Sequence, residues 1–218
     1  MIHIKRNIVL ASVLAAALAG GASADVIFTN FGAGMSYNTG LGNPVGNDFA
    51  GDNVAEADSF IPTTNARVQS LALALSCVVS CPASDNFTIT LAANNGGSPG
   101  AAIENFVFTS TLLGSLGSNN ASIIATSVLD PILQHGTEYW VIVKSTPNYA
   151  IAWNLNSTGD MSPQASSTDG GATWLSPSGM TPSALQVNGT LIPEPSAGLL
   201  LASGLLGLAI LRRLRSAC

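Results

Sequence analysis

Basic residues are almost missing from the central part of this chain. Between residues 25 and 191 the only two are Arg67 and Lys144, against eleven acidic residues, which gives this segment a net charge of −9. Nucleic acids and anionic membrane surfaces are bound through lysine and arginine, so the composition argues against both as partners of the segment. Neutral glycans and divalent cations remain open as ligands.

Cysteine and histidine are also scarce. The central segment holds two cysteines, Cys77 and Cys81, and one histidine, His135. These side chains cannot easily complete a four-ligand zinc shell, and a redox pair would need the spacing Cys-x-x-Cys. We therefore predict a disulfide between Cys77 and Cys81, which closes a small loop as in exported proteins.

Catalytic motifs are nearly absent. Residues 96–100 fit the pattern G-x-S-x-G, but Pro99 follows the serine and has no backbone N–H to lend to an oxyanion hole. His135 is expected in a turn, and no spacing identifies a pair of carboxylates suited to glycoside hydrolysis. We predict that the protein is not an enzyme. A secreted hydrolase, with acids converging or a serine near His135, is the most distant alternative.

The N-terminus has the pattern of an export signal. Two basic residues precede an apolar stretch at positions 8–19, and the small residues Ala22 and Ala24 follow it. This pattern predicts a signal peptide over residues 1–24, cut by signal peptidase between Ala24 and Asp25. About 12 apolar residues are too few for a membrane-spanning anchor, which takes about 20.

The C-terminus carries a second targeting segment, residues 192–218. Pro193, Glu194 and Pro195 precede an uncharged apolar run at positions 196–211, for which we predict a short transmembrane helix. The run is closed by three arginines: Arg212, Arg213 and Arg215. Arginines are held on the cytoplasmic side, so the body at 25–191 is expected outside the inner membrane.

This order of Pro-Glu-Pro, apolar helix and arginine cluster resembles the PEP-CTERM sorting signal of exported bacterial proteins. The resemblance implies processing by an exosortase-type protease, transfer to the cell surface, and association with extracellular polysaccharide or biofilm. Two prolines hold the chain extended, as a protease substrate must be. The alternative is a C-terminal anchor that is never cut.

The body at 25–191 is expected to form one all-β domain. Period-two alternation recurs between clusters of Gly, Asn, Ser and Pro, and no stretch keeps a helical period. The predicted strands are 66–76, 86–93, 101–109, 121–128, 138–145, 149–156 and 184–191, and 77–85 is expected to be a hairpin connection. We expect seven to ten strands in an antiparallel β-sandwich, jelly-roll-like or immunoglobulin-like.

The turn at 94–100, Asn-Asn-Gly-Gly-Ser-Pro-Gly, together with the strand pattern, resembles the choice-of-anchor β domains of exported bacterial proteins. That resemblance implies no catalytic residues.

Acidic and amide side chains cluster between positions 47 and 58. Their carboxylates are Asp48, Asp52, Glu56 and Asp58. Calcium accepts six to eight oxygen ligands in irregular geometry, so these four are candidate calcium ligands. The spacing is not that of an EF-hand, and a solvated polar loop is the competing interpretation.

Three tryptophans are the candidates for stacking on sugar rings. Trp140 and Trp153 alternate with aliphatic residues and are expected in the core. Trp174 follows a loop rich in glycine and is the one candidate for ligand binding, although a cap over the core competes with that role.

These observations favour an exported cell-surface or extracellular-matrix protein that acts as a structural or adhesive component of the envelope or biofilm. Before processing, its C-terminal helix would hold it in the inner membrane. A carbohydrate-binding module that uses Trp174 is the alternative function.

Overall fold

The computed structural model describes residues 24–49, 52–79, 81–145, 150–176 and 179–192, and at 47–49 the backbone alone. Most of the predicted signal peptide, including Ala22, and the sorting residues from Pro193 to Arg215 lie outside the described residues. Tyr149, expected at the start of a strand, lies outside them as well.

The described chain forms strands and two short 3-10 helices, and it contains no α-helix. The 3-10 helices are η1 (Ala33–Met35) and η2 (Ser110–Leu112). The strands are β1 (Ala24–Thr29), β2 (Gly42–Phe49), β3 (Asp52–Phe60), β4 (Ala66–Leu73), β5 (Leu75–Cys77), β6 (Asn86–Asn94), β7 (Pro99–Thr109), β8 (Gly114–Ser115), β9 (Ile123–Thr126), β10 (Ile132–Leu133), β11 (Tyr139–Ser145), β12 (Ala150–Asn154), β13 (Gln164–Ser167) and β14 (Leu185–Leu191). The prediction of an all-β body is confirmed.

The strands belong to two sheets. The smaller sheet has the order β1-β14-β4-β10, with β9 paired to β4. The larger has the order β7-β6-β11-β3-β2-β12-β5-β8, with β13 paired to β3. The strand pairs are antiparallel except β5 with β8. This agrees with an antiparallel sandwich.

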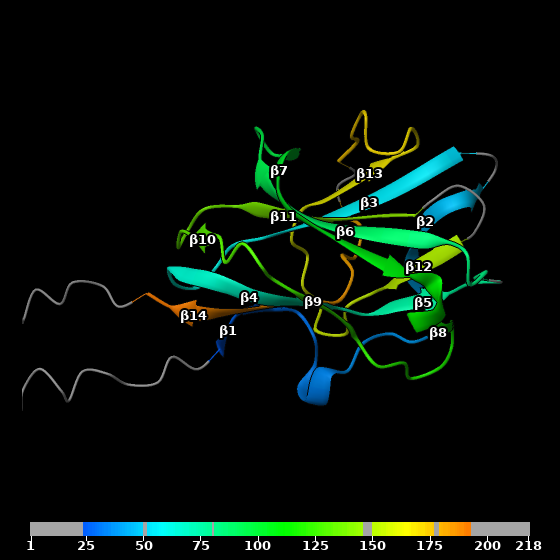
Figure 1. Cartoon of the computed structure of the whole chain (residues 1–218), viewed down its shortest axis with the longest axis horizontal. Coiled ribbons are helices and arrows are strands. Elements are labelled where there is room, and N and C mark those ends of the chain that lie inside the picture. The colour runs from blue at the N-terminus through cyan, green and yellow to red at the C-terminus, as the bar shows by residue number, and fades with distance from the viewer. Residues whose placement is uncertain (1–23, 50–51, 80, 146–149, 177–178, 193–218) are drawn as a thin grey trace, which may run out of the picture.

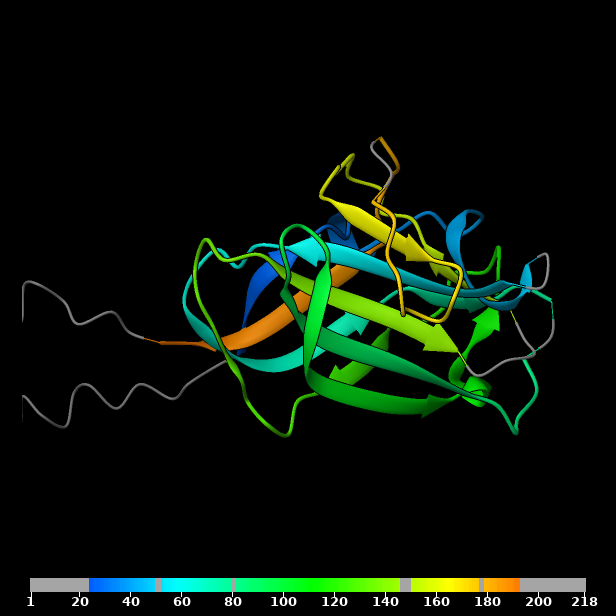
Figure 2. The same cartoon turned by 90° about the horizontal axis from the view of Figure 1, so that it is seen from above.

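The larger sheet curls so that its end joins the layer of the smaller one. Ala74 alone separates β4 from β5, and its backbone N–H and C=O bond to Ala184 and Asn154. Figure 1 shows β4 and β5 in one line below β6, β11 and β3, and Figure 2 shows the same strands from above.

The main core lies between these layers. Alternate residues of β6, namely Phe87, Ile89 and Leu91, are fully buried there, as their period-two spacing predicts. Leu71 and Leu73 of β4 face them from the smaller sheet.

An acidic side chain joins the two sheets at one edge. Glu104 of β7 accepts hydrogen bonds from Ser127 Oγ (2.6 Å) and from the backbone N–H groups of Val128 (2.7 Å) and Leu129 (3.1 Å), which follow β9. Partial desolvation raises the pKa of Glu104, but these three hydrogen bonds outweigh it and lower the pKa below its ordinary value. Glu104 is therefore a carboxylate at neutral pH.

The prediction of seven to ten strands was too low. The described chain has fourteen, because the predicted strand 66–76 is divided into β4 and β5, and because β1, β2, β3 and the short strands β8, β10 and β13 were not among the predicted strands. The segment at 47–58 is not a polar loop: β2 and β3 run through it and pair with each other. The alternation of apolar and polar residues that marks a strand is not visible here, because two of the acidic residues, Glu56 and Asp58, occupy buried positions.

The disulfide between Cys77 and Cys81 is present, with the two Cα atoms 5.9 Å apart. The prediction that 77–85 forms a hairpin connection was wrong. β5 pairs with β12 and β8, whereas β6 pairs with β7 and β11, so the stapled segment crosses between non-adjacent strands of the larger sheet. Hydrophobic periodicity identified the strands but not their partners.

Both ends of the domain lie side by side. β1 and β14 pair antiparallel, with Ala24 opposite Thr190, and Figure 1 shows the start of β1 and the end of β14 at one end of the molecule. The backbone N–H of Ile192 bonds to the C=O of Asn65 at 2.9 Å, which fixes the exit direction of the chain.

Candidate functional site

Three polar side chains are buried together where β13 pairs with β3. Glu56, Asp58 and Gln164 are only 4 %, 2 % and 3 % exposed. Gln164 lies directly opposite Asp58 in the ladder, and Glu56 is two residues from Asp58 on the same face of β3. Val141, opposite Asp58 on the other side, belongs to the main core, so the three side chains point into the sandwich.

Their hydrogen bonds are incomplete. Gln164 Nε2 donates to Glu56 Oε1 at 3.3 Å, and the backbone N–H of Ser183 donates to Asp58 Oδ2 at 2.8 Å. Glu56 Oε2, Asp58 Oδ1 and Gln164 Oε1 are buried without a hydrogen-bond partner. All three atoms are acceptors, and unpaired buried polar atoms are rare enough in folded proteins to require an explanation.

Burial raises the pKa of both carboxyl groups. For Glu56, desolvation and the nearby charge of Asp58 raise the pKa from 4.5 to about 9. For Asp58, desolvation raises the pKa from 3.8 to about 7, with the charge of Asp160 adding to the rise and hydrogen bonds from Ser183 opposing it. The pair therefore binds protons in the pH range where ordinary carboxyl groups are ionised.

The segment before β14 brings Ser183 to Asp58. Asn30 Nδ2 donates to the C=O of Ser183 (2.9 Å) and to Asp160 Oδ2 (3.0 Å), while Asn30 Oδ1 accepts the N–H of Leu185 (2.7 Å). Asn30 is 4 % exposed, so this bridge is itself buried. This bridge holds the segment before β14 in place beside Asp58 of β3. It also brings a third carboxylate, that of Asp160, near the buried pair.

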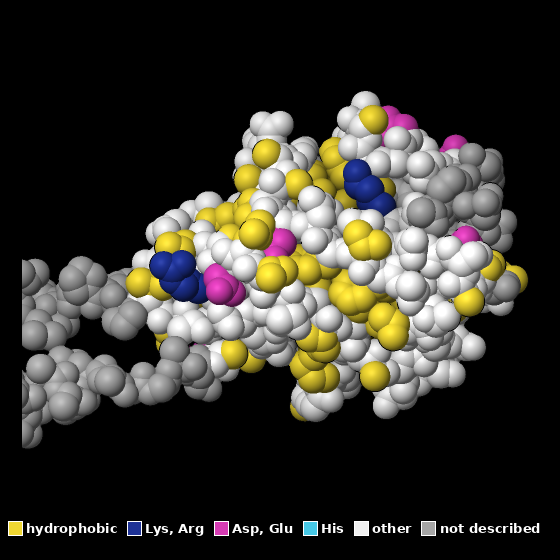
Figure 3. Space-filling view, viewed as in Figure 1, with side chains coloured by type: hydrophobic (Ala, Val, Ile, Leu, Met, Phe, Trp, Pro, Cys, Tyr) yellow, Lys and Arg dark blue, Asp and Glu magenta, His cyan; other side chains and the backbone are white. Residues whose placement is uncertain are grey.

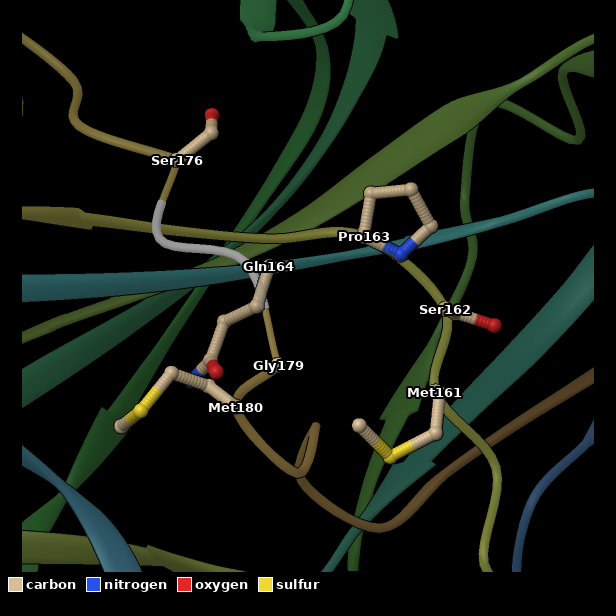
Figure 4. Close-up of a pocket in the computed structure, with 7 residues that line it drawn as sticks. All are labelled: Met161, Ser162, Pro163, Gln164, Ser176, Gly179 and Met180. Atoms are coloured by element: carbon tan, nitrogen blue, oxygen red, sulfur yellow. The ribbon is translucent and has the colours of Figure 1, made fainter.

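A cavity of about 320 Å³ adjoins these residues. It is lined by residues 161–164, 176, 179 and 180, and thus by Gln164. Figure 4 shows Gln164 between Met180 and Pro163 at the wall of this pocket. The buried carboxyl pair thus lies behind a side chain that also faces the pocket.

The predicted calcium ligands are not brought together as a set. Asp52, at the start of β3, is exposed, whereas Glu56 and Asp58 are buried, and the side chain of Asp48 lies outside the described residues. Within the described part of the chain, no three His, Cys, Asp or Glu side chains are grouped so that they could hold a metal ion.

Trp174 lies on the opposite face of the larger sheet and is half-buried. It packs against a cluster that contains Trp140 and Ile142 of β11, Ala57 of β3 and Ala165 of β13. Trp140 and Trp153 are fully buried, as predicted. Contact with this cluster gives Trp174 the capping role over the sheet that competed with sugar binding.

The turn before Trp174 is held by Asp169. Its carboxylate accepts hydrogen bonds from Ser167 Oγ, the N–H groups of Ala172 and Thr173, and Thr173 Oγ1. Hydrogen bonds from Thr173, Ser167 and Ala172 hold the pKa of Asp169 well below its usual range. Gly171 has φ of 88°, a left-handed backbone conformation that favours glycine at this turn.

Replacing Asp169 by alanine is expected to release this turn and expose the indole of Trp174 to solvent. Iodide quenching of tryptophan fluorescence should increase, because Trp140 and Trp153 stay buried and only Trp174 changes. Asp85→Ala is the matched control, since that partly exposed carboxylate lies in a different segment of the chain, where Ser84 Oγ donates to it. Equal quenching of Asp169→Ala and the unmodified protein would show that the turn holds without the carboxylate.

The remaining sequence candidates lie apart from the buried acids. His135 is exposed in a turn and its backbone N–H bonds to Asn65 Oδ1 at 2.8 Å, as expected of a turn residue. Residues 95–98 connect β6 to β7, and Pro99 begins a strand, so the G-x-S-x-G segment lacks the helix of a nucleophile elbow.

Sequence reasoning missed Gln164, Ser183 and Asn30. Each lies in a polar stretch with no periodic pattern, and its burial depends on contacts more than 100 positions away in the chain. The Asn and Gln residues themselves gave no signal, because such residues are usually exposed.

Comparison with known proteins does not identify a family for this chain. A scan against protein-family models found no match, and a search of curated proteins found none. Among the described residues, no helix has the length and hydrophobicity to cross a bilayer.

Proposed function

We propose that the chain is an exported β-sandwich protein, jelly-roll-like or immunoglobulin-like, that is displayed at the cell surface or in the extracellular matrix as a non-enzymatic structural or adhesive component. The single observation that carries the proposal is the position of the two chain ends. Ala24 and Thr190 are paired neighbours, so a signal peptide and a sorting segment would both attach to one end of the domain.

This arrangement suits a tethered domain. Cleavage after Ala24 leaves Asp25 opposite Gly189 within the sheet, so export does not disturb the fold. Ile192 is fixed by its bond to Asn65 immediately before Pro193. A C-terminal tether, cut or uncut, would then hold the domain by one end and present the opposite end away from the membrane.

The surface and the disulfide support the same location. Basic side chains occupy only two small spots on the face in Figure 3, and most of that face is uncharged. Such a surface suits neutral polysaccharide better than nucleic acid. The Cys77–Cys81 disulfide fits an oxidising compartment.

The same geometry supports a non-enzymatic role. Glu56 and Asp58 are buried rather than placed across an open cleft, and His135 is in an exposed turn. The packing of Trp174 leaves only part of its ring for a sugar, so a carbohydrate-binding module has weaker support.

The test is to follow processing of the full chain in a bacterium that has an exosortase-type protease. We expect a mature N-terminus at Asp25 and loss of the C-terminal segment. Protease added to intact cells should digest the mature protein, because it is displayed at the cell surface. Replacing Pro193, Glu194 and Pro195 together by alanine should leave the C-terminus uncut in the membrane. Cys218→Ser, in the same tail, is the control that should be processed normally. An intact N-terminus on a cytoplasmic chain would refute the proposal.

A further inference from the structure

We propose that Glu56, Asp58 and Gln164 form a calcium site between β3 and β13, at the wall of the pocket lined by residues 161–164, 176, 179 and 180. This site differs from the sequence-based candidate, because it excludes Asp48 and Asp52 and includes an amide oxygen from another strand. It does not depend on where the protein is located.

The three side chains that carry the unpaired oxygens are neighbours. Gln164 is opposite Asp58 in the ladder and donates a hydrogen bond to Glu56, so it lies beside both acids. Glu56 Oε2, Asp58 Oδ1 and Gln164 Oε1 each lack a partner and each belongs to a side chain more than nine-tenths buried. A buried acceptor without a donor is the kind of group that a bound cation satisfies.

The charge balance points to a cation. The two basic residues of the body are elsewhere: Lys144 lies beside Gly171 on the opposite face of the sheet, and Arg67 lies on β4 opposite Ile132 and Thr190. The acids that face the site are Glu56 and Asp58, with Asp160 adding negative charge nearby. Ionised carboxylates buried without a positive partner are costly.

A single proton does not complete the hydrogen bonding. A proton on one carboxyl oxygen lets that atom donate to one acceptor, which pairs two of the three oxygens, and the third is paired only when the other carboxyl group is protonated as well. A bound cation would take the place of both protons.

The donor set selects a hard cation. Carboxylate and amide oxygens without thiolate or imidazole suit calcium or magnesium, and calcium tolerates irregular geometry with six to eight ligands. Water can supply the others, because a cavity of about 320 Å³ borders Gln164 and a water molecule takes about 30 Å³.

The test is calorimetric titration of the full chain in non-ionic detergent with CaCl2, after removal of divalent ions by a chelator. We expect saturable binding and a melting temperature raised by about 5 °C or more at a hundredfold excess over Kd. Magnesium, which requires stricter geometry, should bind more weakly.

Variants assign the response to these residues. Glu56→Gln and Asp58→Asn should each weaken calcium binding at least about tenfold, whereas Asp52→Asn, an exposed acid on the same strand, should bind like the unmodified protein. Absence of calcium binding to the unmodified protein would overturn the proposal. Binding that persists unchanged in both folded variants would place any calcium elsewhere and would overturn it as well.

Discussion

Replacing Trp153 by alanine is expected to lower the free energy of unfolding by about 3–5 kcal/mol. The indole is fully buried in the main core, and its Nε1–H donates to the C=O of Ala184 at 3.0 Å. The substitution leaves a large cavity where the curled end of the larger sheet meets β14, and it removes one of the two hydrogen bonds that the C=O of Ala184 accepts, the other coming from the N–H of Ala74. Urea unfolding followed by circular dichroism measures the loss.

Trp174→Ala is the matched control for this prediction. Trp174 is half-buried and packs on the outer face of the larger sheet, so its removal should cost about 1–2 kcal/mol. A loss as large as that of Trp153→Ala would show that the outer-face cluster is as important to stability as the main core. Loss of retention on a glycan column with little change in stability would instead favour sugar binding by Trp174.

The second large effect is a fall in stability as the pH rises. In the presence of a chelator, the free energy of unfolding should decrease by on the order of 3 kcal/mol between pH 5 and pH 9. Burial, followed by the charge of Asp58, raises the pKa of Glu56 to about 9, and burial raises that of Asp58 to about 7. Between the unfolded values near 4 and these folded values, the folded state binds more protons than the unfolded state. Stability is therefore full at the acidic end of this window and is lost as the protons leave.

The two acids with lowered pKa values, Glu104 and Asp169, do not account for a loss of stability between pH 5 and pH 9. The pKa values of Glu104 and Asp169 are lowered, so the stability linked to them is lost only as the pH falls below the ordinary carboxyl range. Unfolding by urea at a series of pH values between 5 and 9 measures the slope.

Glu56→Gln tests the cause. Glutamine has the shape of the protonated acid and cannot ionise, so the variant should lose much of the slope and be more stable than the unmodified protein at pH 9. Asp52→Asn, which removes an exposed carboxylate from the same strand, should keep the slope. A flat pH profile in the unmodified protein would show that the buried pair does not titrate on folding.

The sequence predicted those strands whose apolar residues alternate over several positions. Residues 86–93 and 138–145 match β6 and β11 closely, because every second side chain there enters the main core. The disulfide followed from the small number of cysteines and their spacing. Local composition also predicted a targeting segment at each end. Both remain predictions, because most of their residues lie outside the described residues.

β3 was not predicted, for a physical reason. In this strand, Glu56 and Asp58 occupy positions that face the core, while Ala57 is buried on the other face under Trp140. A rule that places apolar residues inside cannot detect a strand whose inward side chains are acids, since burying a charge is unfavourable unless protons, donors or a cation compensate it. Part of that compensation comes from two donors: Gln164 of the paired strand β13 donates to Glu56, and the backbone N–H of Ser183 donates to Asp58.

The sequence by itself determined an acidic, all-β body with one stapled loop, because these properties depend on composition and on patterns a few residues long, and it predicted a targeting segment on each side of that body. Only the tertiary structure decided which strands pair, that the two ends of the domain are neighbours, and that Glu56, Asp58 and Gln164 meet. Gln164 is 108 positions from Glu56, and Ser183 is 125 from Asp58. Contacts at such separations are set by the register and curl of whole sheets, which no local pattern specifies.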